Sequence, residues 1–435
     1  MKKKGLLIVA CIMCIALVMM VVPLFSGCAS QPSAPPPTTA KPPSSAPPPA
    51  TTPATQAPPP STSAPPPPPS STTAAKPSIK IGAILHLTGE NAILGPACKN
   101  ALEYRLEQAG GQAAGRKIEL MVEDDGTDPV KSVDKARKLV ESDKVDVILG
   151  PVHGACAPAV ANYLTASKTP HLIFMPKSIG ILKTGGNEFL PFGTLAGTGY
   201  PLGLYAYDKL GYRTATVAVE DFVSGLEFVG GMTKAFQKRG GTIIQTQPIK
   251  PGTMDFSPNL TAMKDADACF FWFTPVLAQR FVAQYYAAGL KMPLVIPNAT
   301  VLFPKSLAEI GTKSIGMIGS ASYTSLIDTP MNKSYVEAFA KKYGMPPMAE
   351  GVSADVCLTM YLEAVKATGG DTSFAKISDA LHKVKADTPA GTYSFTAEGL
   401  GIGDLYIINV TQLPDRLDWS VVDKYSQMPL DVPAQ

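Results

Sequence analysis

The chain has 435 residues, 45% of them hydrophobic, and its 38 lysines and arginines nearly balance its 35 acidic residues. Three of the lysines lie within the first four residues, so the remainder carries 35 basic against 35 acidic side chains. A chain with no net charge and no basic stripe is not expected to bind nucleic acid. Its length exceeds what a single core supports, which predicts two domains.

The N-terminus has the organisation of an export signal. A lysine-rich start precedes an almost entirely apolar run over residues 5–22, and Ser26 and Gly27 stand directly before Cys28. This order is typical of a lipoprotein signal, in which residues 1–27 are removed and the cysteine thiol is linked to lipid. Phe25 departs from the smaller aliphatic residue usual in such signals. The alternative is a plain transmembrane anchor, because about 20 apolar residues can span a bilayer.

A proline-rich segment follows the cysteine. Residues 29–77 contain 19 of the 42 prolines, and Lys41 and Lys76 are their only charged residues. Such a composition cannot bury apolar surface and favours extended polyproline II. We therefore interpret residues 28–77 as a lipidated cysteine followed by a tether, with a proline-rich ligand for a partner protein as the alternative.

From residue 78 onward, short apolar strands alternate with helices. In the first half, strands are predicted at 79–85, 117–123, 145–149 and 171–175, and helices at 96–108, 128–141 and from about 156. The pattern restarts with strands at 214–219, 242–247, 268–273 and 294–296, and with helices at 224–239 and 276–288. Three more helices (332–343, 348–367 and 374–382) and two short strands (392–395 and 404–410) end the chain. This alternation predicts parallel sheets with both faces covered.

The repeated pattern predicts an α/β fold of two doubly wound parallel-sheet lobes joined by a three-strand hinge. We expect residues 78–197 and 325–390 to form the N-terminal lobe, and 198–324 and 391–435 the C-terminal lobe. The glycine-rich segment 193–203 lacks the spacing of a dinucleotide-binding loop and is predicted to be a crossover loop between the lobes. Ligands of such sheets bind beyond the carboxyl ends of the strands, so two facing lobes could enclose one by closing on a hinge.

Enzyme and metal chemistry find no support in the sequence. The motifs GxSxG and HExxH and a phosphate-loop lysine are missing, so we expect neither an enzyme nor a cofactor. The histidines, at 86, 153, 171 and 382, have no metal-type spacing. Cys98, Cys156, Cys269 and Cys357 are widely scattered, which leaves one disulfide open but favours buried thiols for at least two of them.

Three segments of the first half occur together in a known family. They are residues 82–89 after the first strand, 110–129 around the second strand and 147–151 at the end of the third strand. In combination they resemble the type I periplasmic solute-binding proteins of the branched-chain amino-acid (leucine/isoleucine/valine) binding family. The resemblance implies a small-molecule ligand, the permease subunits of an ATP-binding-cassette importer as partners, and a location in the periplasm or on the outer face of the cell membrane.

The resemblance also implies a ligand site built from loops of both lobes. In amino-acid binders the loop after the third strand offers donors to the ligand carboxylate, and it corresponds here to His153, Gly154 and Ala155. The loop after the fourth strand contributes Lys177 and Ser178. Lys177 is expected either to pair with a ligand carboxylate or to be a solvated loop lysine.

Five further positions complete the candidate site. Leu94 stands where an aromatic residue often covers the ligand, and Thr274 where an aromatic or polar group is found. Phe222 either stacks on the ligand or packs in the lobe, and Tyr200 near the first crossover is a weaker candidate. Asn298 stands where an acidic residue holds the ligand ammonium in amino-acid binders.

The asparagine at 298 changes the expected ligand. A buried ammonium without a counter-charge is costly in a closed site. We therefore expect a carboxylate without an amine, or another small polar metabolite, in place of an unmodified α-amino acid. The alternative function is a ligand-sensing module for a membrane signalling receptor, which uses the same fold.

Overall fold

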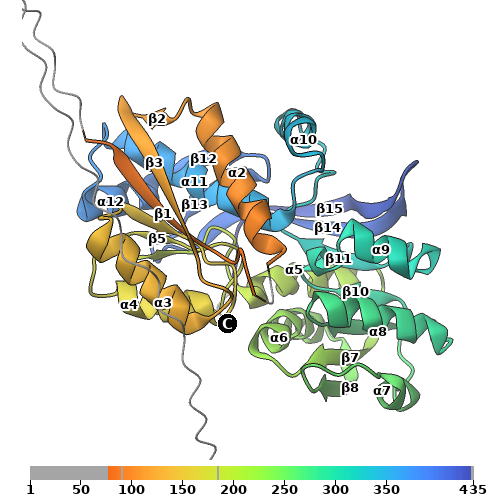
Figure 1. The fold of residues 1–435 in the computed structure, drawn as a ribbon. Helices are drawn as coiled ribbons and strands as arrows, with labels where there is room; N and C mark the ends of the chain where they lie inside the picture. The colour runs from red at the N-terminus through yellow and green to blue at the C-terminus, as the bar shows by residue number, and fades with distance from the viewer. Residues whose placement is uncertain (1–76, 90–91, 184–185, 433–435) are drawn as a thin grey trace, which may run out of the picture. The chain divides into compact units, whose positions relative to one another are not determined.

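Two β-sheets organise the part of the chain that the computed structural model describes, residues 77–89, 92–183 and 186–432 (Figure 1). These residues belong to the unit Thr72–Gln435. The predicted signal peptide, the predicted lipidation site Cys28 and nearly all of the predicted tether lie outside the described residues. Within the described ranges, no helix is both long and apolar enough to cross a membrane.

The first lobe contains a six-stranded sheet with the order β2-β3-β1-β4-β5-β6. All neighbours are parallel except the short β2, which is antiparallel to β3. The strands are β1 (Ile79–Leu85), β2 (Gln112–Ala113), β3 (Arg116–Asp124), β4 (Val147–Leu149), β5 (His171–Leu172) and β6 (Glu188–Phe189). The helices are α2 (Leu94–Gln108), α3 (Pro129–Arg137, continued by a π-helical turn to Ser142), α4 (Cys156–Leu164), α10 (Pro330–Tyr343), α11 (Ala349–Ala367) and α12 (Phe374–Lys383).

Local sequence explains where the first-lobe helices begin. The Asp128 side chain accepts hydrogen bonds from the backbone N–H groups of Val130 and Lys131, and Pro129 occupies the first turn of α3. α11 packs along α2, and the buried carboxylate of Asp355 receives two hydrogen bonds from the Arg105 guanidinium, at 2.8 and 3.0 Å. The returning helices are thereby fixed to the N-terminal part of the lobe.

A nine-stranded mixed sheet lies mainly in the second lobe, and its β12–β13 hairpin packs against α11 and α12 of the first lobe. Its parallel strands follow the order β8-β7-β9-β10-β11, and β14 is antiparallel to β11. The strands are β7 (Thr214–Glu220), β8 (Thr242–Ile249), β9 (Ala268–Trp272), β10 (Leu294–Ile296), β11 (Ile318–Ala321), β12 (Lys385–Thr388), β13 (Gly391–Phe395), β14 (Gly401–Gln412) and β15 (Leu417–Pro429). The helices are α5 (Leu195–Asp208), α6 (Val223–Lys238), α7 (Ser257–Thr261), α8 (Pro275–Ala287) and α9 (Pro304–Ile310).

The aromatic run at the end of β9 shows how the sheet is covered on both faces. Phe270 contacts Phe236 of α6, whereas Phe271 stacks on Phe281 of α8. Phe273 also contacts Phe281. Successive side chains of a strand point to opposite faces, so an uninterrupted apolar run fills two helix-covered layers. This confirms the buried strand predicted for the run.

The prediction of a crossover loop over residues 193–203 is wrong, because residues 195–208 form helix α5. Its glycines are needed for close packing on α6. A Cβ at Gly199 would lie 2.2 Å from the Phe228 carbonyl oxygen, and one at Gly203 would lie 2.0 Å from the Met232 carbonyl oxygen. The low helix propensity of glycine hides a helix whose contact surface requires residues without side chains.

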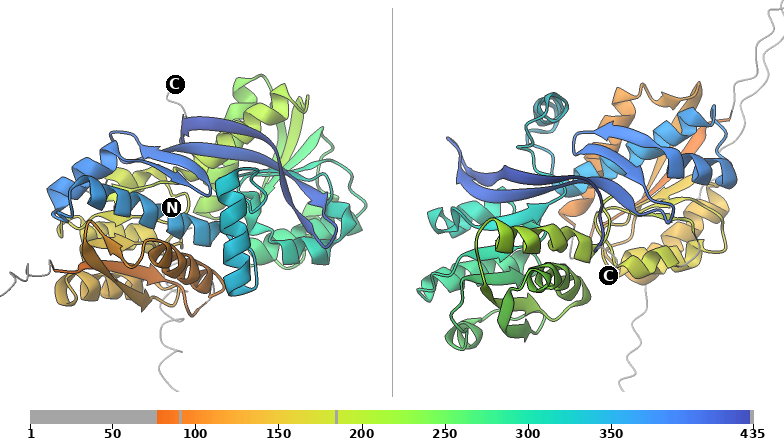
Figure 2. Two further views of the ribbon diagram at one scale, coloured as in Figure 1. Left: turned by 90° about the horizontal axis from the view of Figure 1, so that it is seen from above. Right: turned by 180° about the vertical axis from the view of Figure 1, so that it is seen from behind.

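Several segments cross between the lobes side by side. Leu190 N donates to Gly399 O, and Gly401 N donates to Leu190 O, at 2.9 and 2.8 Å. The C-terminal end joins them, because Thr194 N donates to Leu430 O at 2.7 Å and Leu430 N to Gly401 O at 2.9 Å. Figure 2 shows the β14–β15 pair running from this junction across the second lobe. The β12–β13 hairpin spans the predicted lobe boundary at residues 390 and 391.

Candidate functional site

The predicted site residues lie mainly where parallel strands of the two sheets end. In the first lobe these are the loops after β4 and β5, which carry His153 to Ala155 and Lys177 to Ser178. In the second lobe they are the segments after β7, β9 and β10, which carry Phe222, Thr274 and Asn298. The carboxyl ends of parallel strands are where α/β sheets bind their ligands.

A buried polar chain holds the loop after β4. His86 Nδ1 lies 2.6 Å from Asp125 Oδ1, and the other carboxylate oxygen accepts a 2.6 Å hydrogen bond from Ser132 Oγ. His86 Nε2 accepts the backbone N–H of His153 at 2.8 Å, so its own proton lies on Nδ1 and is donated to Asp125. Burial would raise the pKa of Asp125, but the hydrogen bonds from His86 and Ser132 outweigh it and hold the pKa below its usual value.

The turn after β4 brings polar groups to the surface. Gly150 has φ +87°, and a Cβ there would lie 2.6 Å from the Ile84 carbonyl oxygen, so only glycine fits. Gly154 and Ala155 are exposed, and His153 is half-buried. The Ala155 N–H donates to His153 Nδ1 at 3.3 Å, just before α4 begins. The N–H groups of His153 and Ala155 are thus bonded within the protein, and an anion would be favoured at the N-terminus of α4, which begins directly after them.

Lys177 is neither solvated nor directed at an open surface. Its side chain is 3% exposed, and its ammonium donates to the carbonyl oxygens of Phe174, Pro176 and Met175 at 2.6, 3.2 and 3.3 Å. The expected alternative of a solvated loop lysine is thus wrong. Three acceptors match the three N–H donors of an ammonium. Desolvation by burial lowers the pKa of Lys177 to about 7. Contact with a ligand carboxylate stays a prediction.

The two lobes contact each other at these loops. Ser178 Oγ, after β5, donates a 2.7 Å hydrogen bond to Glu227 Oε1 on α6 of the second lobe. A Cβ placed on Gly154 would lie 3.2 Å from Ser224 Oγ, also on α6. The first turn of α6 therefore faces both predicted ligand loops of the first lobe. Sequence reasoning did not single out Ser224 or Glu227, because neither follows a strand directly.

The second lobe contributes a buried acid that the sequence analysis missed. Glu220 is the last residue of β7, and its Oε2 accepts the Thr274 backbone N–H at 2.7 Å. Thr274 itself is half-buried, as is Phe222 at the start of α6. An acidic residue ending an otherwise apolar strand was the signal available in the sequence.

Asn298 follows β10, and only β9 separates that strand from β7, which ends at Glu220. Asn298 is 9% exposed and adopts a left-handed backbone with φ 53° and ψ 57°. Non-glycine residues in this region of φ/ψ space are uncommon and cluster at binding sites. Its Oδ1 accepts a 3.1 Å hydrogen bond from Thr300 Oγ1.

The remaining two predicted positions lie within helices and not in the loops after the strands. Leu94 is half-buried at the first turn of α2. Tyr200 is 4% exposed and belongs to helix α5, not to a loop near a crossover.

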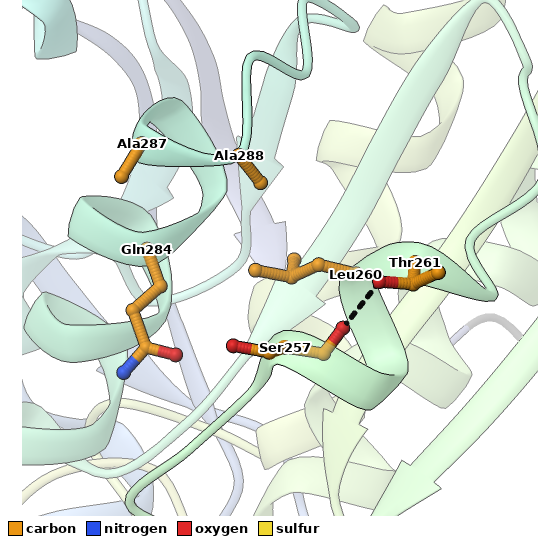
Figure 3. A pocket seen from close by; sticks show the side chains of 6 residues that line it. All are labelled: Ser257, Leu260, Thr261, Gln284, Ala287 and Ala288. Carbon is orange, nitrogen blue, oxygen red and sulfur yellow. Dashed lines mark hydrogen bonds between the residues drawn. The ribbon is translucent and has the colours of Figure 1, made fainter.

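A pocket of about 290 Å³ lies between α7 and α8, and it contains none of the predicted site residues (Figure 3). Gln284 beside it already uses its side chain to bind the backbone, because Oε1 accepts the Phe256 N–H and Nε2 donates to Met254 O. The pocket is lined by Ser257, Leu260, Thr261, Gln284, Ala287 and Ala288. It offers no charged group to a ligand.

The four cysteines Cys98, Cys156, Cys269 and Cys357 are buried free thiols, which confirms the preference for thiols over a disulfide. Desolvation raises the pKa of Cys156, beside the ligand loop, to about 11, so this thiol is not an activated nucleophile. Within the described ranges, no group of three or more potential ligating side chains gathers to hold a metal.

Comparison with known proteins identifies the architecture. The sequence model of the periplasmic binding protein family matches residues 78–414. The chain belongs to this family. The match covers both lobes and starts where the predicted tether ends, and it confirms the resemblance to the type I, branched-chain amino-acid binding group.

Individual periplasmic binding proteins resemble most of the chain. The Leu/Ile/Val-binding protein homolog 6 of Brucella suis is 24% identical over 347 residues, which are 78% of this chain and 88% of the homolog. An ABC transporter substrate-binding protein from Sphaerobacter thermophilus is 28% identical with a TM-score of 0.77, covering 82% of this chain and 99% of that one. A solute-binding protein of Rhodopseudomonas palustris BisB5, in complex with 3,4-dihydroxybenzoic acid, is 25% identical with a TM-score of 0.74, covering 81% and 98%.

Membership of the periplasmic binding protein family settles the broad function. Its members are extracytoplasmic solute-binding proteins and not enzymes, so the expectations of a binding function, a small-molecule ligand and a location outside the cytoplasm are confirmed. The two-lobe α/β fold is confirmed as well.

Proposed function

We propose that this protein is the lipid-anchored receptor of an ATP-binding-cassette importer and that it captures a small carboxylate without an α-amino group. The proposed class of ligand rests on the presence of Asn298 after β10. This is the position to which the family resemblance assigns the acid that holds the ligand ammonium in amino-acid binders, and the amide of Asn298 cannot neutralise an ammonium.

The first-lobe loops support the carboxylate end of this ligand. His153, Gly154 and Ala155 precede the N-terminus of α4, and the polar chain through His86 and Asp125 fixes their backbone. A preorganised loop loses little entropy on binding an anion. In this proposal Lys177 adds positive charge beneath the loop after β5, while its hydrogen bonds keep that loop in place.

The second-lobe residues support the other end of the ligand. Phe222 at the start of α6 offers an aromatic surface, Thr274 a hydroxyl, and Leu94 of the first lobe an apolar contact. The relative from Rhodopseudomonas palustris BisB5 that is 25% identical was solved with 3,4-dihydroxybenzoic acid, an acid of this class. Tyr200, buried in α5, supports the lobe behind these residues.

Titration calorimetry with the full-length chain in detergent tests the ligand class. We expect 3,4-dihydroxybenzoate or benzoate to bind on the order of 100-fold more tightly than leucine, because the leucine ammonium would meet the N–H donors of Asn298 in place of an acid, and Glu220 already accepts the Thr274 N–H. The matched variant is Asn298→Asp, which should weaken acid binding and improve leucine binding. Tighter binding of leucine by the unmodified chain would contradict the proposal.

Membrane anchoring has a separate test. Cells that express the chain and incorporate a labelled fatty acid should label it, and Cys28→Ala should abolish the label and release the protein from membranes. A Cys28→Ala variant that stays membrane-bound would favour the plain transmembrane anchor. Uptake of labelled ligand that requires the chain would separate import from sensing.

A further inference from the structure

The carboxylate of Glu220 is only partly used by the protein. Its Oε2 accepts the Thr274 N–H, but the described residues give Oε1 no hydrogen-bond partner. The residue is 4% exposed, and Oε1 retains contact with solvent. A buried carboxylate normally satisfies both oxygens, and one that keeps an accepting atom at an opening is suited to a donor from outside.

Glu220 and Asn298 lie at the same level of the sheet. Val219 pairs with Trp272, and Val295 pairs with Phe270. Glu220 ends β7, Thr274 follows β9 and Asn298 follows β10, so the three residues form a row along the carboxyl edge of the sheet. Adjacent strands are about 4.8 Å apart, so β7 and β10, with β9 between them, are separated by roughly 10 Å.

Asn298 offers a hydrogen-bond donor, whereas Glu220 offers an acceptor. Its Oδ1 is occupied by the Thr300 hydroxyl, and the described residues give its Nδ2 no acceptor. Nδ2 also retains contact with solvent. The row therefore presents one free acceptor, Glu220 Oε1, and one free donor, Asn298 Nδ2, on either side of β9.

We propose that Glu220 and Asn298 together recognise a hydroxyl group on the end of the ligand opposite its carboxylate. This inference rests on the proposed function and narrows it to hydroxylated carboxylic acids. The ligand hydroxyl donates to Glu220 Oε1 and accepts from Asn298 Nδ2.

The pairing distinguishes a hydroxyl from other groups. A hydroxyl both donates and accepts, which matches the two side chains, whereas an ammonium only donates and would face the Asn298 N–H groups. An unsubstituted acid would leave both side chains without partners. A site built to bond a hydroxyl discriminates strongly against an analogue that lacks it.

The experiment measures the affinities of 3,4-dihydroxybenzoate and benzoate by calorimetry with the full-length chain in detergent. For the unmodified chain we expect the hydroxylated acid to bind at least about 10-fold more tightly. Glu220→Gln should reduce that preference about 10- to 100-fold, as expected for a hydrogen bond to a charged acceptor, and should change benzoate binding little. Asp221→Asn, an exposed acid on the next residue, is the matched control and should change neither affinity.

Two negative outcomes are distinguishable. Binding of neither acid by the unmodified chain would overturn the proposed function and this inference together. Binding of both acids with a preference that Glu220→Gln leaves unchanged would overturn only the role of Glu220. Because a glutamine oxygen can still accept the Thr274 N–H, a normal melting temperature of the variant would show that the fold is retained.

Discussion

Ser178 of the first lobe donates its hydroxyl hydrogen to Glu227 of the second lobe across 2.7 Å. Ser178 lies in a loop of the first lobe and Glu227 in helix α6 of the second lobe. The bond therefore forms only when the lobes are close together. The same region contains Gly154 opposite Ser224. The contact therefore contributes to the balance between separated and closed lobes.

Ser178→Ala should shift this balance toward separated lobes. A hydrogen bond to a charged group contributes about 1.5–3 kcal/mol, and partial exposure of both side chains places the effect at the lower end. Small-angle scattering of the ligand-free protein should report a larger radius of gyration than for the unmodified chain. Ser178→Thr keeps a hydroxyl and is the control. Identical scattering of all three would show that the bond has no influence on the lobes.

Lys177→Met should remove a pH dependence of anion binding. The pKa of Lys177 is lowered to about 7, so its positive charge is present below that pH and is lost as the pH rises through it. If the charge supports a ligand carboxylate, the affinity of the unmodified chain should fall between pH 7 and 9. The variant should bind more weakly at pH 6 and show a flat profile. Calorimetry at several pH values measures both, and unchanged binding would remove Lys177 from the site.

Glu350 should make the protein less stable as the pH rises from about 4.5 to 7. Desolvation raises the pKa of this 6% exposed carboxyl to about 7, so the unfolded chain ionises first and binds fewer protons in this range. Glu350→Gln should gain stability relative to the unmodified chain over the same range, by at most about 3 kcal/mol. Urea unfolding at pH 4.5 and 8 measures the difference.

His171 affects stability with the opposite sign over part of the same pH range. Burial lowers the pKa of His171 from 6.5 to about 4, so its contribution to stability is lost as the pH falls from about 6.5 to 4. The contribution of Glu350 is therefore measured as the difference between the variant and the unmodified chain at each pH, in which the effect of His171 cancels. A Glu350→Gln profile parallel to that of the unmodified chain would contradict the assignment to Glu350.

Gly203→Ala should destabilise the second lobe, whereas Gly230→Ala should stabilise it. A Cβ at Gly203 would lie 2.0 Å from the Met232 carbonyl oxygen, and overpacking of this kind costs about 1–3 kcal/mol or more. Gly230, in α6, has open space around it, so alanine gains about 0.5–1 kcal/mol of helix propensity. Denaturant unfolding of the two variants compares them directly, and a Gly203→Ala variant at least as stable as the unmodified chain would refute the close contact of α5 and α6.

Strands with uninterrupted apolar sequence could be predicted almost to the residue. The strand predicted at 79–85 is β1, and the one at 294–296 is β10. Buried parallel strands need apolar residues on both faces, so they stand out from their surroundings. The predicted strand at 171–175 is shorter in the structure, where β5 comprises His171 and Leu172, and the left-handed Met175 precedes the predicted ligand loop.

The edge strand β15 was not visible in the sequence, whereas the edge strand β8 was predicted. β15 pairs only with β14, and the exposed part of Leu417–Pro429 is polar, with Lys424 and Gln427 among its residues. Its hydrophobic pattern is therefore weak. Helix α5 was missed for the related reason that its packing surface consists of glycines.

The positions of the site loops followed from strand ends, but their partners did not. The sequence placed Ser178 after a strand, whereas its bond to Glu227 joins residues 49 positions apart. The burial of Lys177 depends on three carbonyl groups of its own loop, which no spacing of side chains reveals. Contacts between lobes and bonds to the backbone are properties of the folded chain alone.

The junction of Leu190, Gly401 and Leu430 restricts how the lobes can move. A side chain at Gly401 would lie 1.9 Å from the Pro191 carbonyl oxygen, so the crossing strands are in direct contact there. Strands tied by backbone hydrogen bonds bend together but do not slide past one another, so the motion available is a rotation about a fixed axis. Gly154 and Ser178 of the first lobe both meet the N-terminal end of α6, and a rotation about this junction would keep the predicted ligand loops of the two lobes in register.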